Sequence, residues 1–429
     1  MHFADATPPL TTAQALLEAE RCLYCHDAPC ATACPTGIPV PSFIKRIAEG
    51  NLRGAAHAIL EANPLGGMCA RVCPTEVLCE QVCVRNTQQG MPITIGRLQR
   101  HAVDALMTSA RPQLFTRGAP SGKRVAVVGS GPAGLACAHG LARLGHEVTV
   151  LEARPKAGGL NEYGLATYKT VNDYAQREIA WLLDLGGIRI QHGWVLGDNG
   201  TIATLQATYD AVFLGLGLTR VQALQVPGET LEGVRNAVDF IAELRQAPDY
   251  RQLPIGRRVV VIGGGMTAVD AAVQARLLGA EDVHMVYRRG PQAMSASAAE
   301  QEWAQTHGVT LHFWLAPQSI EGQGGHVAAV RFARQRMVDG QLLATDEVVT
   351  LQADMVFKAI GQRLNDTPLQ GTGLDLREGR IATDADGATS IKGVWAGGDC
   401  RFGGLDLTVE AVEHGKRSAH AIHQYLTQA

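Results

Sequence analysis

Two stretches of this chain repeat one order: a short apolar run, closely spaced glycines, a helical segment and a second apolar run. The first stretch reads "RVAVVG", "SGPAGLACAHGLARLG" and "HEVTVLE", and the second reads "RRVVVIG", "GGMTAVDAAVQARLLG" and "DVHMVYRR". Strand, glycine turn, helix and strand in this order are typical of a βαβ unit with a parallel sheet. The repeat predicts two α/β lobes, each able to bind a nucleotide, and not a solenoid.

The first glycine set is Gly129, Gly131 and Gly134. The first of these permits a tight turn, the second lets the backbone approach a pyrophosphate, and the third lets the helix pack closely on the strand. The N-terminus of that helix presents free N–H groups to the phosphates. Glu152 ends the second strand, where its carboxylate can accept a hydrogen bond from a ribose hydroxyl. We assign Gly159, which follows this strand, to the same cofactor site.

The second glycine set is Gly263 and Gly265 with Ala268 in the third position, where alanine is an accepted variant. The second strand of this unit ends in Arg288 and Arg289, not in an acid. A cationic pair at this place suits a 2′-phosphate, which favours NADP(H) over NAD(H). The alternative is a solvated basic edge. Two sites in one chain imply two dinucleotides, and one flavin with one nicotinamide is the natural pair for hydride exchange.

Eight of the ten cysteines occur in two groups, "CLYCHDAPCATACP" and "CARVCPTEVLCEQVC". Disulfides are not expected to persist in a cytosolic protein. Zinc is the next alternative, but zinc cannot take electrons, and a flavin without a redox disulfide needs an outlet. Cysteine groups that end in C-P are typical of ferredoxins, in which the cysteine before the proline serves the other of two clusters. The two groups therefore favour two [4Fe–4S] clusters.

Composition argues against several classes of protein. The net charge is −3, whereas nucleic-acid binding usually shows as a basic balance, so no nucleic-acid partner is expected. No apolar run is long enough to span a bilayer, so no membrane association is expected. The start "MHFADATPPL" lacks the charged and apolar regions of a secretory signal. We therefore expect a cytoplasmic protein of two to four domains.

The chain resembles the two-dinucleotide-domain flavoproteins, in which the first glycine set holds FAD and an inserted lobe holds NAD(P)H. "GVWAGGDC" is similar to the C-terminal FAD motif of that group, so the resemblance implies that Asp399 binds the flavin ribityl chain. It also implies that the N-terminus of the next helix, at Thr408 and Val409, points at the isoalloxazine. A positive helix end there would stabilise a reduced, anionic flavin.

We therefore expect an α-helical iron–sulfur domain followed by two α/β Rossmann-like domains, with the NAD(P)H domain inserted into the FAD domain. The expected limits are 1–118 for the helical domain with two [4Fe–4S] clusters, 119–235 for the first part of the FAD domain, 236–357 for the NAD(P)H domain, and 358–429 for the second part of the FAD domain.

"CHDAPC", "NPLGGMCARVCPTEVLCEQVC" and "ITIGRLQR" resemble the cluster region of dihydropyrimidine dehydrogenase, and the resemblance covers nearly the whole chain. It implies two ligand sets, which are Cys22, Cys25, Cys30 and Cys83 for one cluster and Cys34, Cys73, Cys79 and Gln99 for the other. Cys69 would then be a spare. Counting alone instead assigns eight cysteines to eight ligand positions. Ser295 stands where the family has a further arginine, which bears on the NADP preference.

The resemblance implies the smaller subunit of the bacterial two-subunit dihydropyrimidine dehydrogenase. Such a chain takes a hydride from NAD(P)H onto FAD and passes single electrons through two [4Fe–4S] clusters to a partner. The partner holds FMN, further clusters and the site that interconverts uracil or thymine with dihydropyrimidines, and a heterotetramer is expected. No acid–base catalytic residue is expected here, because hydride transfer to flavin requires close stacking. The alternatives are the glutamate synthase small subunit, a stand-alone ferredoxin–NADP reductase-type subunit, and a cluster scaffold without flavin.

Overall fold

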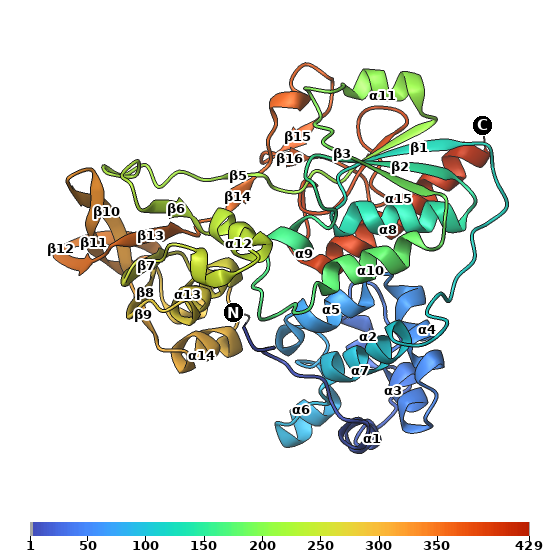
Figure 1. The fold of residues 1–429 in the computed structure, drawn as a ribbon, viewed down its shortest axis with the longest axis horizontal. Coiled ribbons are helices and arrows are strands. Elements are labelled where there is room, and N and C mark those ends of the chain that lie inside the picture. The colour runs from blue at the N-terminus through green and yellow to red at the C-terminus, as the bar shows by residue number, and fades with distance from the viewer. Residues whose placement is uncertain (1–2, 429) are drawn as a thin grey trace. The chain divides into compact units, whose positions relative to one another are not determined.

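The computed structural model describes residues 3–428 and divides them into two compact units. The larger unit contains residues 5–162, 169–219 and 363–428, and the smaller unit contains residues 3–4, 163–168 and 220–362. The chain therefore builds part of the larger unit, then most of the smaller unit, and then returns to complete the larger one. Figure 1 follows this course by colour from blue to red.

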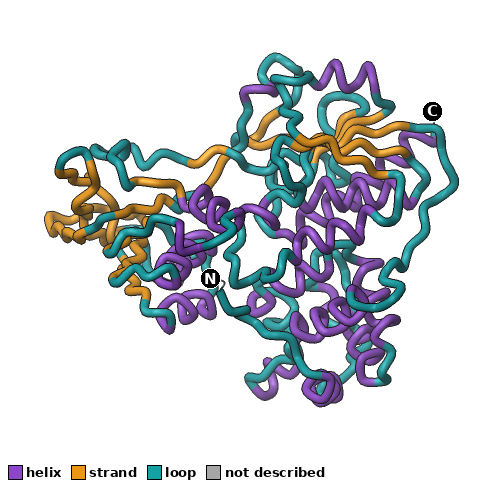
Figure 2. The backbone as a smooth tube through the Cα atoms, in the orientation of Figure 1, coloured by secondary structure: helices purple, strands orange, loops and turns teal. Residues whose placement is uncertain are grey.

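The N-terminal part of the larger unit is helical because its apolar residues recur at helical spacing. In α3 (Val40–Ala48), for example, Val40, Phe43, Ile44 and Ile47 are buried on one face. The helices of this part are α1 (Thr12–Glu20), α2 (Pro29–Thr32), α3, α4 (Leu52–Ala62), α5 (Gly66–Val72), α6 (Val84–Gln89) and α7 (Ile95–Met107), with a 3-10 helix at Thr75–Val77. Figure 2 shows how loops alternate with short helices here. Most of the clustered cysteines lie in these loops or near the helix ends, whereas Cys69 lies within α5.

A five-stranded parallel sheet forms the second part of the larger unit. Its strands, in spatial order, are β17 (Val394–Ala396), β4 (Ala211–Leu214), β1 (Arg124–Val128), β2 (Glu147–Glu152) and β3 (Ile188–His192). Strand β17 comes from the end of the chain and pairs with β4, so the returning segment completes the sheet. The remaining elements are α8 (Pro132–Arg143), α9 (Leu160–Tyr163), α10 (Tyr174–Leu183), α11 (Ile202–Thr208), a 3-10 helix at Thr367–Leu369, the pair β15 (Leu376–Arg377) and β16 (Arg380–Ile381), and α15 (Thr408–Thr427).

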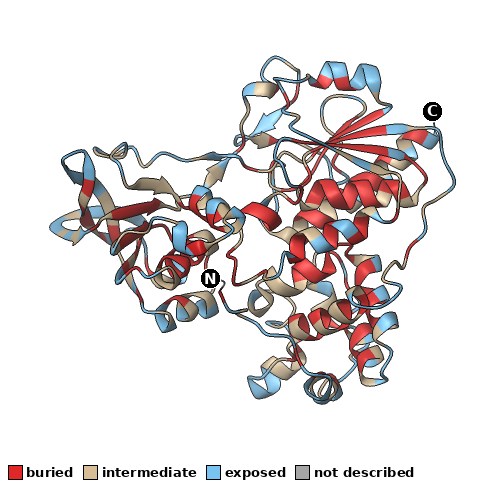
Figure 3. Cartoon of the chain, in the orientation of Figure 1, coloured by how far each residue is buried: buried red, intermediate tan, exposed pale blue. Residues whose placement is uncertain are grey.

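Helices α8 and α15 pack tightly on each other beside this sheet (Figure 1). Glycine makes the close approach feasible, because a Cβ at Gly415 would overlap the Ala133 carbonyl oxygen. Figure 3 shows that α8 and the central strands are largely buried, whereas α15 buries only part of its surface. The packing brings the N-terminal end of α15 into the same unit as the first glycine set.

The smaller unit contains a second five-stranded parallel sheet. Its strands, in spatial order, are β6 (Val234–Asn236), β13 (Met355–Lys358), β7 (Arg258–Ile262), β8 (Asp282–Tyr287) and β9 (Val309–Phe313). Its helices are α12 (Ala237–Gln246), α13 (Met266–Leu277) and α14 (Ala298–Thr306), with 3-10 helices at Tyr250–Gln252 and Pro291–Ala293. An antiparallel sheet of β10 (Leu315–Gln323), β11 (His326–Val338) and β12 (Gln341–Gln352) follows, and β5 (Arg220–Val221) pairs with β14 (Gln362–Arg363).

The two strand–glycine–helix–strand patterns form as the sequence predicts. The first gives β1, α8 and β2, and the second gives β7, α13 and β8, with both strand pairs parallel. Within residues 3–428, no helix combines the length and the apolar character that a membrane-spanning segment requires.

Candidate functional site

The first glycine set links the end of β1 to the start of α8. Gly129 has φ +97°, and a Cβ there would overlap the Gly215 carbonyl oxygen on the neighbouring strand connection. A Cβ at Gly134 would overlap the carbonyl oxygen of Gly129 itself. These two glycines are therefore required by the packing of the strand–helix turn.

Gly131 differs from Gly129 and Gly134 because a Cβ on it would face open space. It is the N-cap of α8, and the nearest atom to a Cβ placed on it is the Gly159 Cα at 4.0 Å. Gly159 has φ +55°, so the two glycines form a cradle without side chains. No side chain caps the N-terminus of α8, and its N–H groups are available to an anion. This arrangement fits a pyrophosphate.

The Glu152 carboxylate lies at the end of β2, buried beside the same turn. It accepts hydrogen bonds from the Ser130 amide at 2.9 Å, from the Ser130 hydroxyl, and from the Arg154 amide at 2.7 Å. Its position is thus fixed by backbone donors. Ser130 is not one of the residues expected from the glycine motif, although its place between Gly129 and Gly131 is the signal that could have identified it.

Asp399 follows β17 and lies in the larger unit with the first glycine set. Burial raises the pKa of its carboxyl group to about 6, with Asp406 adding to the rise and Arg380 opposing it. In the described part of the chain, no residue donates a hydrogen bond to this carboxylate. Because a buried carboxylate without donors is costly, the group fits a ligand that brings hydroxyl groups, such as the flavin ribityl chain.

Helix α15 begins beside Asp399, with Thr408 and the buried Val409 in its first turn. No side chain caps this 20-residue helix at its N-terminus. The Thr408 hydroxyl donates to the Asn161 side-chain oxygen at 2.9 Å, which ties α15 to the segment after β2. Asn161 is buried and was not singled out in the sequence. The positive helix end fits the place of a group that gains negative charge.

The second glycine set lies in the smaller unit between β7 and α13. Gly263 has φ +150°, and a Cβ there would overlap the Ala359 carbonyl oxygen. Gly265 is the N-cap of α13, which has no side-chain cap, and Ala268 is fully buried under the helix. A Cβ at Gly265 would lie 3.1 Å from the Ser295 hydroxyl oxygen, so Ser295 borders this turn.

Arg288 and Arg289 lie directly after β8, and both are exposed. Neither guanidinium has an ion pair with another described residue. Two free cations at the end of the second strand fit a bound phosphate group.

One of the two predicted ligand sets surrounds a cavity. Cys22, Cys25, Cys30 and Cys83 all line one partly open cavity in the helical part. Its other walls are mainly apolar residues of α3 and of the segments that carry the cysteines. The structure thus brings Cys83 from the second cysteine group to three cysteines of the first, as the resemblance implies. Thiolates around an apolar space suit an iron–sulfur cluster. Within residues 3–428, no three acidic, histidine or cysteine side chains are close enough together to hold a single metal ion.

The other cysteines also lie near one another. The pKa of the Cys73 thiol is raised by a hydrogen bond to Cys69, by burial, and by the nearby Cys34 and Cys79. Gln99 is buried on α7, and its amide nitrogen donates to the Gly66 carbonyl at 2.6 Å. Cys69 therefore lies next to Cys73, while Gln99 reaches the start of the helix that carries Cys69. Three cysteines are thus gathered with Cys69 as a fourth thiol, and Gln99 contacts the first residue of the helix that carries Cys69.

Two family descriptions match this chain. The description "Pyridine nucleotide-disulphide oxidoreductase" matches residues 123–415, and "Dihydropyrimidine dehydrogenase domain II, 4Fe-4S cluster" matches residues 1–111. The boundary between them falls near residue 118, the expected end of the helical domain.

Curated relatives match along the whole length. The NAD-dependent dihydropyrimidine dehydrogenase subunit PreT of Salmonella typhimurium is 34% identical over 429 residues, which is 100% of this chain and 98% of the relative. The glutamate synthase (NADPH) small chain of Halomonas elongata is 32% identical, over 99% of this chain and 93% of the relative.

Solved structures share this fold over about 72% of the chain. FprA from Mycobacterium tuberculosis has a TM-score of 0.61 at 22% identity, covering 72% of this chain and 85% of FprA. Thioredoxin reductase from Lactococcus lactis has a TM-score of 0.56 at 22% identity, covering 72% of this chain and 100% of that one.

Proposed function

This chain belongs to the pyridine nucleotide-disulphide oxidoreductase family, and we propose that it acts as an electron-entry subunit. It is also a relative of the dihydropyrimidine dehydrogenase subunit PreT. It is an NAD(P)-dependent flavoprotein oxidoreductase of the electron-transfer type, with an iron–sulfur domain before its nucleotide-binding lobes. We propose that it takes a hydride from NAD(P)H onto FAD and passes single electrons through two [4Fe–4S] clusters to an FMN-containing partner subunit. That partner would interconvert uracil or thymine and 5,6-dihydropyrimidines, which are CH–CH substrates.

The observation that carries the proposal is the cavity lined by Cys22, Cys25, Cys30 and Cys83. The four thiols belong to the same unit as the first glycine set and Asp399, so a cluster site and a flavin site would share one unit. Bound flavin can accept a hydride and release electrons singly, which matches acceptors that take one electron at a time.

In the larger unit, this chain's own groups would bind and orient FAD. The Gly131 and Gly159 backbone would face the pyrophosphate, and Glu152 would accept a hydrogen bond from the ribose. Asp399 would accept from the ribityl hydroxyls, while the N-terminus of α15 would face the ring system. The proposed limits are those expected from the sequence, with the helical domain at 1–118, FAD-binding parts at 119–235 and 358–429, and the NAD(P)H domain at 236–357.

We propose that the smaller unit binds NADP(H) in preference to NAD(H), with Arg288 and Arg289 on the 2′-phosphate. The support is their exposure without ion pairs at the end of β8. The PreT relatives carry "NAD-dependent" in their names and the glutamate synthase relative carries NADPH, so the nucleotide choice needs its own test.

Replacing Arg288 and Arg289 together by alanine should raise KM for NADPH much more than KM for NADH. Loss of charge-assisted hydrogen bonds to a phosphate costs about 1.5–3 kcal/mol, or roughly one to two decades in KM. Steady-state dye reduction with each nucleotide measures the effect. A matched control is Arg257→Ala, an exposed arginine before β7 that pairs with Glu281. Equal effects of the double variant on both nucleotides would show that these arginines do not bind the 2′-phosphate.

We propose that the second cluster is held by Cys34, Cys73, Cys79 and Gln99, with Cys69 as a neighbour that is not a ligand. The Gln99→Ala variant should then lose about half of the iron, because one of two four-iron clusters lacks a ligand. Cys69→Ser should keep the full iron content. Iron analysis and the electron paramagnetic resonance spectrum of reduced protein distinguish the two ligand sets, and the opposite pattern would assign the fourth position to Cys69.

We propose a cytoplasmic heterotetramer with the FMN-containing subunit and no nucleic-acid or membrane partner. Because the chain is also similar to a glutamate synthase small chain, the second candidate is electron delivery to a large amidotransferase. Co-expression with the FMN-containing subunit, followed by co-purification and an assay with uracil and NAD(P)H, tests the first candidate. Absence of both co-purification and NAD(P)H-dependent uracil reduction would contradict it.

A further inference from the structure

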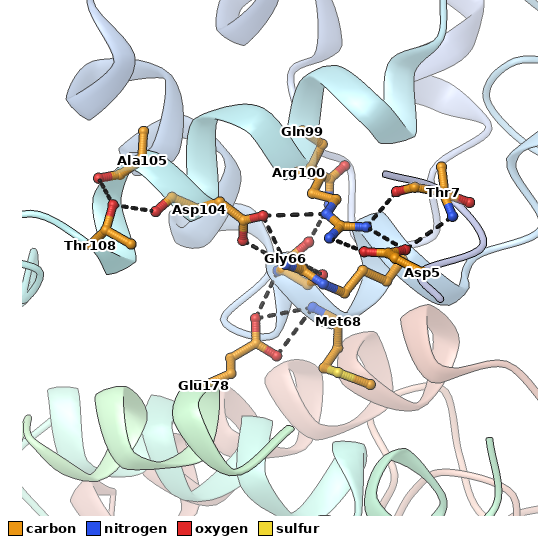
Figure 4. A network of polar contacts seen from close by, with 12 residues as sticks. Asp5, Thr7, Gly66, Met68, Gln99, Arg100, Asp104, Ala105, Thr108 and Glu178 are labelled. Atoms are coloured by element: carbon orange, nitrogen blue, oxygen red, sulfur yellow. Dashed lines mark hydrogen bonds and ion pairs between the residues drawn. The ribbon is translucent and has the colours of Figure 1, made fainter. Parts of the chain in front are cut away.

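The side-chain amide of Gln99 has a fixed orientation. Its Nε2 atom lies 2.6 Å from the carbonyl oxygen of Gly66, and Figure 4 shows the two residues facing each other. A backbone carbonyl can only accept a hydrogen bond, so the amide atom that faces it must be the nitrogen. The amide oxygen, which is the atom that can bind a metal, is then left on the other side. The Gly66 carbonyl therefore decides which atom of Gln99 is offered as a ligand.

Gly66 begins α5, and the first turn of this helix is held from outside. Leu65, at the N-cap position, provides no side-chain cap. Glu178 of α10 takes that role, because its Oε1 accepts from the Gly67 amide at 2.7 Å and from the Met68 amide at 3.1 Å. The carboxyl group is fully buried and points at the turn in Figure 4. It satisfies amides that the start of a helix otherwise leaves without partners.

The turn cannot easily move, because it is packed on two sides. A Cβ at Gly66 would lie 2.6 Å from Ile59 Cγ2, and a Cβ at Gly67 would overlap the Tyr174 hydroxyl. Arg71, one turn later on α5, donates to the Gly67 carbonyl at 2.9 Å. These contacts transmit any displacement of the α10 side chains to the start of α5.

Arg71 also joins α5 to the helix that carries Gln99. Its guanidinium donates to both Asp104 carboxylate oxygens, at 2.7 and 2.8 Å, and Asp104 lies on α7. The guanidinium carbon lies 3.3 Å from the centre of the Tyr174 ring. The start of α5, the middle of α7 and the side chains of α10 therefore form one buried network.

Glu178 does not need its charge for this contact. Burial raises the pKa of its carboxyl group to about 8, against the opposing effect of the Gly67 and Met68 amides. An oxygen of the group can accept a hydrogen bond in either protonation state. A glutamine side chain offers the same acceptor at the same reach, so Glu178→Gln is a conservative replacement.

We propose that Glu178 is a positioning residue for the second cluster site: it holds the first turn of α5 so that the Gly66 carbonyl keeps the Gln99 oxygen directed to the ligand side. The inference rests on the proposed function, because it requires Gln99 as a ligand. Helix α5 also ends at Cys73, whose amide donates to the Cys69 carbonyl, so the same contact positions a thiol of that set. A residue of the nucleotide-binding part thereby shapes a site in the helical part.

The test compares Glu178→Ala and Glu178→Gln in the full chain with the control Glu61→Ala. Glu61 pairs with Arg143 and likewise joins the helical part to α8, but it does not touch α5. Iron content, flavin content and a redox titration followed by electron paramagnetic resonance are measured for each. Glu178→Ala should lose one of two reduced-cluster signals, or shift its potential, with flavin content unchanged. Glu178→Gln and Glu61→Ala should match the parent protein.

Unchanged cluster signals and potentials in Glu178→Ala would overturn the proposal, and so would a Glu178→Gln variant that behaves like the alanine variant. If the alanine variant does not fold, Glu178→Asp shortens the reach by one methylene, and a folded Asp variant with unshifted signals overturns the proposal equally. If Gln99→Ala keeps both cluster signals while Cys34→Ser loses one, the second cluster is present but Gln99 is not its ligand. That result would refute the role of Glu178 towards Gln99 and leave the proposed function intact. A parent protein without iron would instead refute the proposed function.

Discussion

Replacing Gly131 by valine is expected to give a folded protein that is purified without flavin. The position is suited to this test because a side chain there meets open space, with the nearest protein atom 4.0 Å from the added Cβ. No protein atom is close enough to clash with the added Cβ, whereas a pyrophosphate bound against the backbone would collide with the new methyl groups. The loss should be nearly complete, and the absorbance of the purified protein together with flavin released on denaturation measures it.

The matched control is Gly265→Val, which makes the same change at the start of α13 in the smaller unit. That variant should keep its flavin and lose reduction by NADPH, because only the second nucleotide site is blocked. Iron content should be unchanged in both. If Gly131→Val retains full flavin, the first glycine set is not the FAD site. If Gly265→Val loses flavin instead, the two lobes have been assigned in the wrong order.

Cys22→Ser and Cys73→Ser should each abolish electron delivery to the partner subunit while leaving NADPH-dependent dye reduction largely intact. Dye reduction requires only the two nucleotide lobes, whereas delivery requires the cluster that each variant lacks. Uracil consumption with the co-purified partner and dye reduction without it are the two measurements. The expected separation is large, because one activity is lost and the other is retained.

Folding is the main complication, since a cluster also holds its loops together. The helical part packs into an apolar core that it shares with α8, α10 and α15 and that includes the fully buried Phe43, Ile44 and Leu60, so we expect the cysteine variants to remain folded. Flavin and iron contents are measured on each, with Cys69→Ser as the control thiol. The scheme would be refuted by a folded, yellow protein that lacks both clusters and still supports NADPH-driven uracil reduction by its partner.

The strand–glycine–helix turns could be predicted from the sequence because their requirements are local. Gly129 and Gly263 need a positive φ, and both must avoid a carbonyl oxygen on an adjacent strand connection. Such steric demands recur wherever this turn forms, so a spacing of glycines is sufficient to identify it. The helices follow for a similar reason, as in α1, where Thr11 and Gln14 form a capping box within four residues.

The grouping of the cysteines is only partly local. The C-P motif already separates Cys34 from Cys22, Cys25 and Cys30, but it was the family resemblance that placed Cys83 with those three. The cavity agrees with the resemblance, because the chain brings the start of α6 back to the loop after α1. No pattern within either cysteine group contains that information, since it depends on how seven short helices pack. The choice between Cys69 and Gln99 also depends on packing, which places Cys69 beside Cys73 and Gln99 against Gly66 at the start of the same helix.

The sequence by itself determined the two nucleotide lobes, the presence of two cysteine groups and the pairing of a flavin with a nicotinamide, because each rests on residue types at fixed short spacing. Only the tertiary structure decided what surrounds them. Ser130 holds Glu152 through two hydrogen bonds, and Asn161 holds Thr408 through one, although neither residue belongs to a recognisable motif. Glu178 reaches the Gly67 amide across a sequence separation of 111 residues. Glu178 is a single carboxylate on α10 and is not part of any sequence motif. Its role is visible only because the fold brings it to the backbone amides at the start of α5, which have no partner within their own helix.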